Sequence, residues 1–87
     1  MMADHQKILR LLKTARGQLD GIIKMVEEDR YCIDISTQVM ATEAILKRCN
    51  REILAAHLEH CVKNAVTDED RQQKVDELVD TLGRLLK

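Results

Sequence analysis

The chain has 87 residues, a formal net charge of −1, no Pro, Phe or Trp, and only three Gly. A chain of this length forms one small domain with a thin core, and its many Leu, Ile, Ala, Glu, Lys and Arg residues favour an all-α fold. No long uncharged apolar run is present, which argues against a membrane-spanning helix, and the first residues lack the layout of a signal peptide. We therefore predict a single three-helix domain over residues 1–87 of a cytoplasmic protein, in which the three Cys stay reduced.

The first helix is predicted over roughly residues 4 to 28, where apolar residues recur at spacings of three and four. The stripe consists of Ile8, Leu12, Ala15, Leu19, Ile22 and Val26. Gly17 and Gly21 each cost about 1 kcal/mol relative to Ala inside a helix, so we expect close backbone packing at both. Residues 1–25 contain five Lys or Arg against two Asp, which makes this part the predicted anion-facing surface.

The run EEDRYC is predicted to be a turn, followed by a second helix over roughly residues 33 to 65. Its apolar face consists of Ile35, Val39, Thr42, Ile45 or Leu46, Cys49, Ile53 or Leu54, His57 and Cys61. A helix of this length is typical of a bundle or of a coiled-coil-like partner.

The third helix is predicted from Thr67 to about residue 86. Thr67 and Asp70 resemble a capping box in which Asp replaces the usual Glu or Gln. The predicted apolar face consists of Val75, Leu78, Val79, Leu82, Leu85 and Leu86. Three helices with thin apolar stripes indicate a subunit whose core is completed by oligomerisation.

The stretch HLEHC, residues 57–61, contains two His and one Cys. His57 and Cys61 are one helical turn apart, so both can reach one metal ion, whereas His60 points about 100° away from Cys61. Two ligands do not hold an ion firmly, and the further candidates in the chain are Cys32, Cys49 and His5. Taken alone, the pair is also compatible with a buried thiol and a packed or solvated imidazole.

Cys32 precedes His57 by 25 residues, which corresponds to about 37 Å along a continuous helix at 1.5 Å per residue. These residues therefore cannot share an ion within one chain. Two antiparallel copies of the helix, with a two-fold axis near residues 45–46, would place Cys32 of one copy beside His57 and Cys61 of the other. Two thiolates and one imidazole suit three-coordinate Cu(I), and less selectively Zn(II) or Ni(II).

The run GQLDGIIKMVEEDRYCIDISTQ, followed after a long helix by HLEHCV, resembles the copper-sensing repressor family, CsoR, over nearly the whole chain. The GQ-x-x-GI-x-x-M run and the Cys-x24-His-x3-Cys spacing carry this resemblance. It implies a three-helix subunit, an antiparallel dimer and a dimer-of-dimers tetramer. It also implies a homo-oligomer that binds operator DNA in the apo form, without a helix-turn-helix, and releases it when Cu(I) binds.

By the same resemblance, Cys32, His57 and Cys61 fall on the Cu(I) ligands of the copper branch. Tyr31 and Glu77 fall on positions around these ligands, where the free imidazole nitrogen is hydrogen-bonded and the metal is linked to the third helix. The nickel and cobalt branch usually has His in place of Cys61, the formaldehyde branch lacks that Cys, and the sulfur-sensing branch lacks a His at position 57. The resemblance therefore favours copper.

The basic residues depart from the family pattern, because Leu11 and Thr14 stand where relatives commonly carry Arg. Arg48 matches a family arginine. Phosphate contacts depend more on charge than on exact register, so we predict a DNA-binding surface. Its residues are Arg10, Lys13, Arg16 and Arg48.

Three alternatives stay open. Cys32 and Cys61 could form a disulfide or persulfide bridge between chains in a repressor that senses reactive sulfur or redox state. His5 leaves a nickel-responsive member of the same family open. Leu11 and Thr14 motivate a copper-buffering or structural oligomer without a DNA function. An enzyme is not predicted, since the chain offers no nucleophile–base set beyond the ligands and no phosphate-binding Gly loop.

Overall fold

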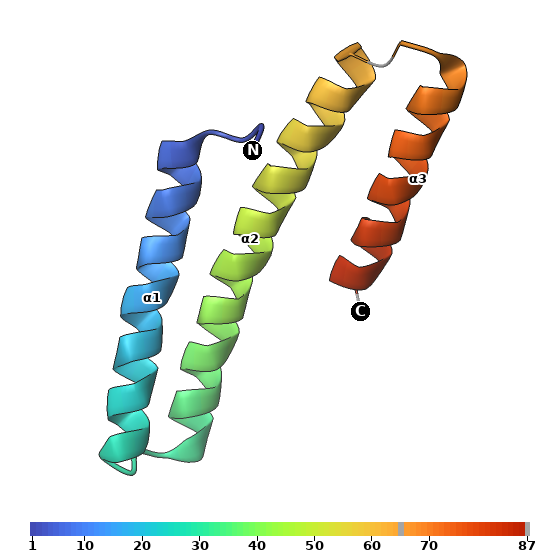
Figure 1. Cartoon of the computed structure of the whole chain (residues 1–87). Coiled ribbons are helices and arrows are strands. Elements are labelled where there is room, and N and C mark those ends of the chain that lie inside the picture. Colours follow the sequence, from blue (N-terminus) through green and yellow to red (C-terminus); the bar gives the residue numbers. More distant parts are fainter. Residues whose placement is uncertain (65, 87) are drawn as a thin grey trace. The chain divides into compact units, whose positions relative to one another are not determined.

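The computed structural model describes residues 1–64 and 66–86, and every regular element in these ranges is an α-helix (Figure 1). Helix α1 spans His5–Glu27, α2 spans Cys32–Asn64 and α3 spans Asp68–Leu85. The predicted all-α fold of three helices is confirmed, while the predicted end of the second helix at residue 65 lies outside the described residues. Among the described residues, no helix is long and apolar enough to cross a membrane.

The chain forms two compact units. The hairpin unit is Asp4–Asn50, which contains α1 and the first part of α2. The C-terminal unit is Arg51–Lys87 together with Met1–Ala3, so it contains the rest of α2, α3 and the start of the chain. That residues 1–87 act as one domain in metal sensing and DNA binding stays a prediction.

Side chains cap the N-termini of α1 and α3. The Asp4 carboxylate accepts hydrogen bonds from the backbone N–H groups of Gln6 at 3.0 Å and Lys7 at 3.4 Å. The Thr67 hydroxyl accepts one from the backbone N–H of Asp70 at 3.0 Å, but the described residues show no return bond from the Asp70 carboxylate. The capping box is therefore half formed, because Asp is one methylene shorter than the Glu that usually reaches back.

Helix α1 ends in a Schellman-type turn, as the run EEDRYC predicted. Asp29 has a left-handed backbone with φ of 54°. Its N–H donates to the Val26 carbonyl at 3.0 Å, and the N–H of Arg30 donates to the Met25 carbonyl at 3.0 Å. These bonds satisfy carbonyls that the helix end would otherwise leave unpaired, and they reverse the chain into α2.

The hairpin unit has a narrow core. Its buried residues are Ile8, Ala15, Ile22, Thr42 and Cys49. The Thr42 hydroxyl donates to the Gln18 side-chain carbonyl at 3.0 Å, so a polar contact joins α1 and α2 within this strip. No described side chain is completely buried, as expected for a layer only two helices thick.

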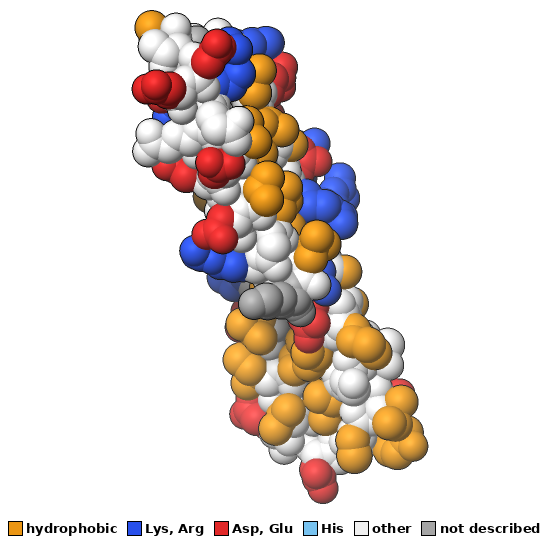
Figure 2. Space-filling model, turned by 90° about the vertical axis from the view of Figure 1, so that its right-hand side faces the viewer, with side chains coloured by type: hydrophobic (Ala, Val, Ile, Leu, Met, Phe, Trp, Pro, Cys, Tyr) orange, Lys and Arg blue, Asp and Glu red, His pale blue; other side chains and the backbone are white. Residues whose placement is uncertain are grey.

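Half of the predicted stripe on α1 is not covered. Leu12, Leu19 and Val26 are 42%, 52% and 59% exposed, so the prediction that they are buried is wrong for this chain alone. Val39 and Leu46 of α2 are likewise exposed. The reason is that each helix of the hairpin unit has one neighbour, which covers one edge of a stripe. Figure 2 shows such hydrophobic side chains gathered on the surface of the hairpin unit.

The two glycines of α1 do not mark close packing inside this chain. A Cβ added at Gly17 or Gly21 would meet no atom within 4 Å, so the prediction of close backbone packing is wrong within the described residues. The helical period places both glycines opposite the buried Ile8 and on the side of Arg10 and Lys13. This side of α1 is open to a large ligand.

In the C-terminal unit, α3 packs along the second half of α2 through the buried Leu78 (Figure 1). Cys61 of α2 and Ala3 of the N-terminal segment are also buried there. Val79 and Leu86, which the sequence placed on the apolar face of the third helix, are 62% and 85% exposed. As in the hairpin unit, a single neighbouring helix leaves the edges of the stripe uncovered.

Candidate metal centre

His57 and Cys61 form a ready pair on α2 in the C-terminal unit. The Cys61 sulfur lies 3.4 Å from Nε2 of His57, which is the contact expected of residues one helical turn apart. Cys61 is only 9% exposed, whereas the His57 side chain is open to solvent. Two potential donor atoms are thus already in contact with each other.

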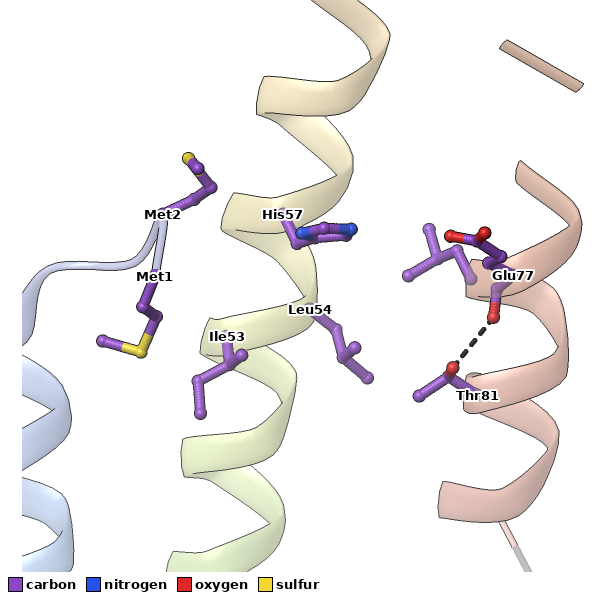
Figure 3. A pocket seen from close by; sticks show the side chains of 8 residues that line it. Met1, Met2, Ile53, Leu54, His57, Glu77 and Thr81 are labelled. Atoms are coloured by element: carbon purple, nitrogen blue, oxygen red, sulfur yellow. Dashed lines mark hydrogen bonds between the residues drawn. The ribbon is translucent and has the colours of Figure 1, made fainter. Parts of the chain in front are cut away.

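Glu77 of α3 lies across a hollow from His57. The hollow has a volume of about 460 Å³, and both residues line it. Figure 3 shows the His57 ring directed toward α3 and the Glu77 carboxylate on the facing side. The Thr81 hydroxyl donates to the backbone carbonyl of Glu77 at 2.8 Å, and the described residues show no hydrogen bond between His57 and Glu77. The structure therefore brings Glu77 close to His57 without joining them.

Two cations that the sequence reasoning missed lie beside Cys61. Arg71 and Lys74 of α3 line a small crevice together with His57 and Cys61. Arg71 is 3.3 Å from the Asp68 carboxylate at the surface. No pattern in the sequence could have revealed this crevice, because the register of α3 against α2 comes from packing.

Cys32 lies apart from this pair. It is the first residue of α2, it belongs to the hairpin unit, and it is exposed together with the preceding Tyr31. No group of three or more His, Cys, Asp or Glu among the described residues could hold a metal ion. Cys32 and His57 are 25 residues apart on the same helix, and they belong to different units. One chain contains the parts of a site but does not assemble them.

The remaining Cys and His have other surroundings. Cys49 is a free thiol in the buried strip of the hairpin unit, only 4% exposed. Nδ1 of His60 is 3.4 Å from the amide nitrogen of Asn64. His5 is the first residue of α1 in the hairpin unit. Within the described part of the chain, none of these residues completes a metal site with His57 and Cys61.

One face of α2 carries all three predicted ligands. Cys32, Val39 and Leu46 recur every seven residues, and the helical period puts His57 and Cys61 on the same face within about 60°. Val39 and Leu46, between the two sets of ligands, are 37% and 46% exposed. Two exposed apolar side chains thus lie on this face between the predicted ligands.

The predicted DNA-binding residues Arg10, Lys13 and Arg16 project from α1, and all three are exposed. Within the described residues none of them forms an ion pair, nor does Arg48 on α2. Arg10 and Lys13 line the same shallow depression. The charges of these four residues are therefore available to an anionic partner.

Comparison with known proteins places these features in context. A sequence profile of the family described as metal-sensitive transcriptional repressor matches residues 4–84. The copper-sensing transcriptional repressor CsoR of Mycobacterium ulcerans (strain Agy99) is 50% identical over 74 residues, which cover 85% of this chain and 63% of that protein. The protein with the same description from Bacillus subtilis (strain 168) is 38% identical over 84 residues, which cover 97% of this chain and 83% of that protein. The chain thus matches just under two thirds of the length of the M. ulcerans relative.

Two solved structures share the fold. One is a crystal structure of the copper-sensing repressor CsoR with Cu(I) from Geobacillus thermodenitrificans NG80-2, with a TM-score of 0.82 and 38% identity. That match covers 94% of this chain and 85% of the other. The other is the nickel-responsive transcriptional regulator InrS, with a TM-score of 0.80 and 30% identity, covering 98% of this chain and 96% of that one.

Proposed function

This chain belongs to the metal-sensitive transcriptional repressor family, and we propose that it represses transcription by binding operator DNA in its apo form and releasing it when Cu(I) binds. The observation that carries the proposal is the single face of α2 that bears Cys32 at one end and the His57–Cys61 pair at the other. The relatives named copper-sensing repressors and the solved structure with Cu(I) support copper as the signal.

The metal site requires two chains. Packing two copies of α2 antiparallel through the face of Val39 and Leu46 covers these exposed side chains and brings Cys32 of one copy to His57 and Cys61 of the other. Because the arrangement is symmetric, each dimer has two such sites. A tetramer made of two dimers is the assembly we propose for the repressor.

Cu(I) fits this set of donors. Thiolate sulfur and imidazole nitrogen are soft ligands, and Cu(I) accepts three of them without a fourth. Cys61 already stands at 3.4 Å from His57, so binding requires the arrival of only one further thiol, Cys32 of the second copy. Glu77 lines the same hollow as His57, and in this proposal it accepts a hydrogen bond from the imidazole nitrogen that the metal leaves free, which would orient the ring. Tyr31 would lie next to the incoming thiol.

DNA binding is proposed for the cations of α1. Arg10, Lys13 and Arg16 have no ion pair in the part of the chain that the structure describes, and Arg48 adds a fourth such cation on α2. Surface cations of this kind attract phosphates and release the counterions of DNA, which supplies most of the affinity. The net charge of −1 limits non-specific binding because acidic residues elsewhere in the chain oppose it.

Release follows from linkage between the two sites. Cys32 follows directly on the turn that ends α1, so a metal that fixes Cys32 to the second copy also fixes the C-terminal end of α1. We propose that α1, when its C-terminal end is fixed in this way, presents its cations less favourably to DNA. Cu(I) binding then weakens DNA binding. DNA must then weaken Cu(I) binding by the same factor.

The experiment is an anaerobic fluorescence-anisotropy titration of DNA from just upstream of the gene for this protein. Apo protein is expected to bind, and stoichiometric Cu(I) is expected to release it, while Zn(II) does not. His57→Ala should bind DNA and ignore Cu(I). His60→Ala, which changes an exposed imidazole on the same helix, is the matched control and should respond like the wild type. A His57→Ala protein that still responds to Cu(I) would refute the proposed site.

Two other signals are favoured by single observations. The contact of Cys61 with His57 and the exposed Cys32 suit a thiol sensor that bridges the two sulfurs between chains. Mass spectrometry after treatment with polysulfide would detect this covalent link, which the copper mechanism does not need. The similarity to InrS and the presence of His5 suit nickel, and release of DNA by Ni(II) but not Cu(I) would select that signal.

A further inference from the structure

The first residues of the chain dock on the C-terminal unit. Met1–Ala3 group with Arg51–Lys87, although α1, which follows directly, belongs to the hairpin unit. Ala3 is 8% exposed and anchors the segment. Met1 and Met2 are 60% and 50% exposed, so their thioethers remain reachable from solvent.

Both methionines stand beside the proposed metal ligand His57. Met1 and Met2 line the same hollow of about 460 Å³ as His57 and Glu77. Figure 3 shows the two methionines on one side of the hollow and Glu77 on the opposite side, with His57 on the helix between them. Met2 also borders a second depression with His60. Two thioether side chains therefore line the same hollow as one proposed copper ligand.

We propose that the thioethers of Met1 and Met2 form a Cu(I) entry site, from which the ion passes to His57 and then to the sensing site; this inference rests on the proposed copper function. A thioether is a soft donor that suits Cu(I) and carries no proton to displace. It is also a weaker ligand than a thiolate, so the entry site holds the ion loosely. An entry site made of thioethers selects Cu(I) against Zn(II) before the ion reaches the ligands of higher affinity.

The transfer is a ligand exchange without change of oxidation state. The bonds from Cu(I) to the two thioether sulfurs break, and bonds to the His57 nitrogen and to the sulfurs of Cys61 and the second copy's Cys32 form. The two thiols lose their protons to solvent as the thiolates bind. Met1 and Met2 return to the free state and can accept another ion.

A direct test uses the full chain with Cys32→Ala and Cys61→Ala, so that the sensing site cannot form. The four methionines are labelled with 13C at the ε-methyl group, circular dichroism checks the fold, and Cu(I) is titrated under anaerobic conditions. The methyl resonances of Met1 and Met2 are expected to shift, whereas those of Met25 and Met40 stay in place. No shift, or equal shifts of all four, would overturn the proposal.

A kinetic test uses the protein with its cysteines intact. Cu(I) is delivered from a glutathione complex, and loading is followed by the ultraviolet thiolate-to-copper band in a stopped-flow instrument. Met2→Leu is expected to load several-fold more slowly, because Leu keeps the volume but lacks the sulfur. Met40→Leu, an exposed methionine of the hairpin unit, is the control and should load at the wild-type rate. Loading of Met2→Leu at the wild-type rate would contradict the entry site.

The two tests separate this inference from the proposed function. If the wild type develops no thiolate-to-copper band but Met1 and Met2 shift in the double Cys variant, the sensing function fails and the methionine site stands. If the band develops normally and the methyl groups do not respond, the sensing site stands and the entry site is wrong.

Discussion

The two ends of α2 contain the same kind of ligand in opposite states. At the start of the helix, Cys32 is exposed and belongs to no potential metal-binding group among the described residues. Toward the end, Cys61 is buried and in contact with His57, with Glu77 across the adjoining hollow. One end is a prepared half-site and the other a single thiol. From this difference we expect that copper binding by this chain requires association of two copies, because neither end alone offers the three proposed ligands.

Some cations of the described residues form ion pairs and others do not. In the C-terminal unit, ion pairs occupy Lys63 with Glu59 at 3.2 Å and Arg84 with Asp80 at 3.0 Å. In the hairpin unit, Arg10, Lys13 and Arg16 have no ion pair among the described residues. The hairpin unit also has a paired cation, Lys24 with Glu28 at 3.9 Å, so we propose that the unpaired cations of α1 are the ones that attract DNA. Under this proposal, metal capture and DNA attraction are concentrated at different places in the chain.

The largest expected effect is on Cu(I) affinity, when each of two variant chains lacks a different proposed ligand. Cys32→Ala and His57→Ala should each lower Cu(I) affinity by at least about 100-fold, since removal of a ligand costs no less than removal of an outer partner. Mixing and refolding the two variants should restore one intact site in every heterodimer. At equal amounts this gives roughly a quarter of the wild-type number of sites per chain. Competition with a Cu(I) chelator measures the number of sites and their affinity.

The control for this mixture pairs Cys49→Ala with His57→Ala. Cys49 is buried in the strip of the hairpin unit and is not one of the proposed ligands, so the Cys49→Ala chain retains every proposed ligand and is expected to bind Cu(I) on its own. A mixture of Cys32→Ala and His57→Ala that recovers no high-affinity sites would show that the three ligands do not come from two chains in the proposed way.

A smaller effect is expected when a cation is removed from α1. Lys13→Ala should weaken apo DNA binding and reduce the slope of log affinity against log salt by about 0.9 for each phosphate that the variant no longer neutralises. Lys63→Ala is the matched control, because Lys63 is occupied by Glu59 at 3.2 Å in the C-terminal unit. Anisotropy titrations over a range of salt concentrations give both slopes. Equal slopes for Lys13→Ala and the wild type would remove Lys13 from the proposed DNA surface.

Most of the fold could be predicted from the sequence, since the periods of Ile8, Ala15 and Ile22 and the turn EEDRYC are local signals. What could not be predicted is which edge of each stripe a single chain buries. Leu12 and Leu19 carry the same apolar signal as Ile8, yet only Ile8 is buried by this chain. Hydrophobic periodicity indicates that a residue will be buried, but it does not say by which copy.

The candidate site shows the same limit. The spacing of Cys32, His57 and Cys61 predicted an intersubunit arrangement, because helix geometry alone separates them. In the structure Cys32 belongs to the hairpin unit and His57 and Cys61 to the C-terminal unit, and the ligand set stays a prediction. The sequence analysis did not identify Arg71 and Met2. Their position near the proposed ligands depends on how α3 and the N-terminal segment dock, and no sequence motif around either residue indicates this docking.

The smallest expected effect concerns the turn that separates α1 from the single-thiol end of α2. Asp29 has φ of 54°, a conformation that Gly adopts without strain and that costs other residues roughly 1 kcal/mol or more. Asp29→Gly should raise the free energy of unfolding by about 0.5 kcal/mol, the relief of strain exceeding the extra flexibility of the unfolded chain.

Asp29→Val should lower the same free energy by about 2 kcal/mol, because a β-branched side chain fits this backbone poorly. Urea denaturation at one fixed protein concentration measures both variants, since association also contributes to stability. Neither change touches a proposed ligand, so Cu(I) stoichiometry should be unaffected. Asp29→Gly could instead alter the Cu(I) affinity without changing the free energy of unfolding. That result would show that the backbone conformation of this turn controls the position of Cys32 for metal binding.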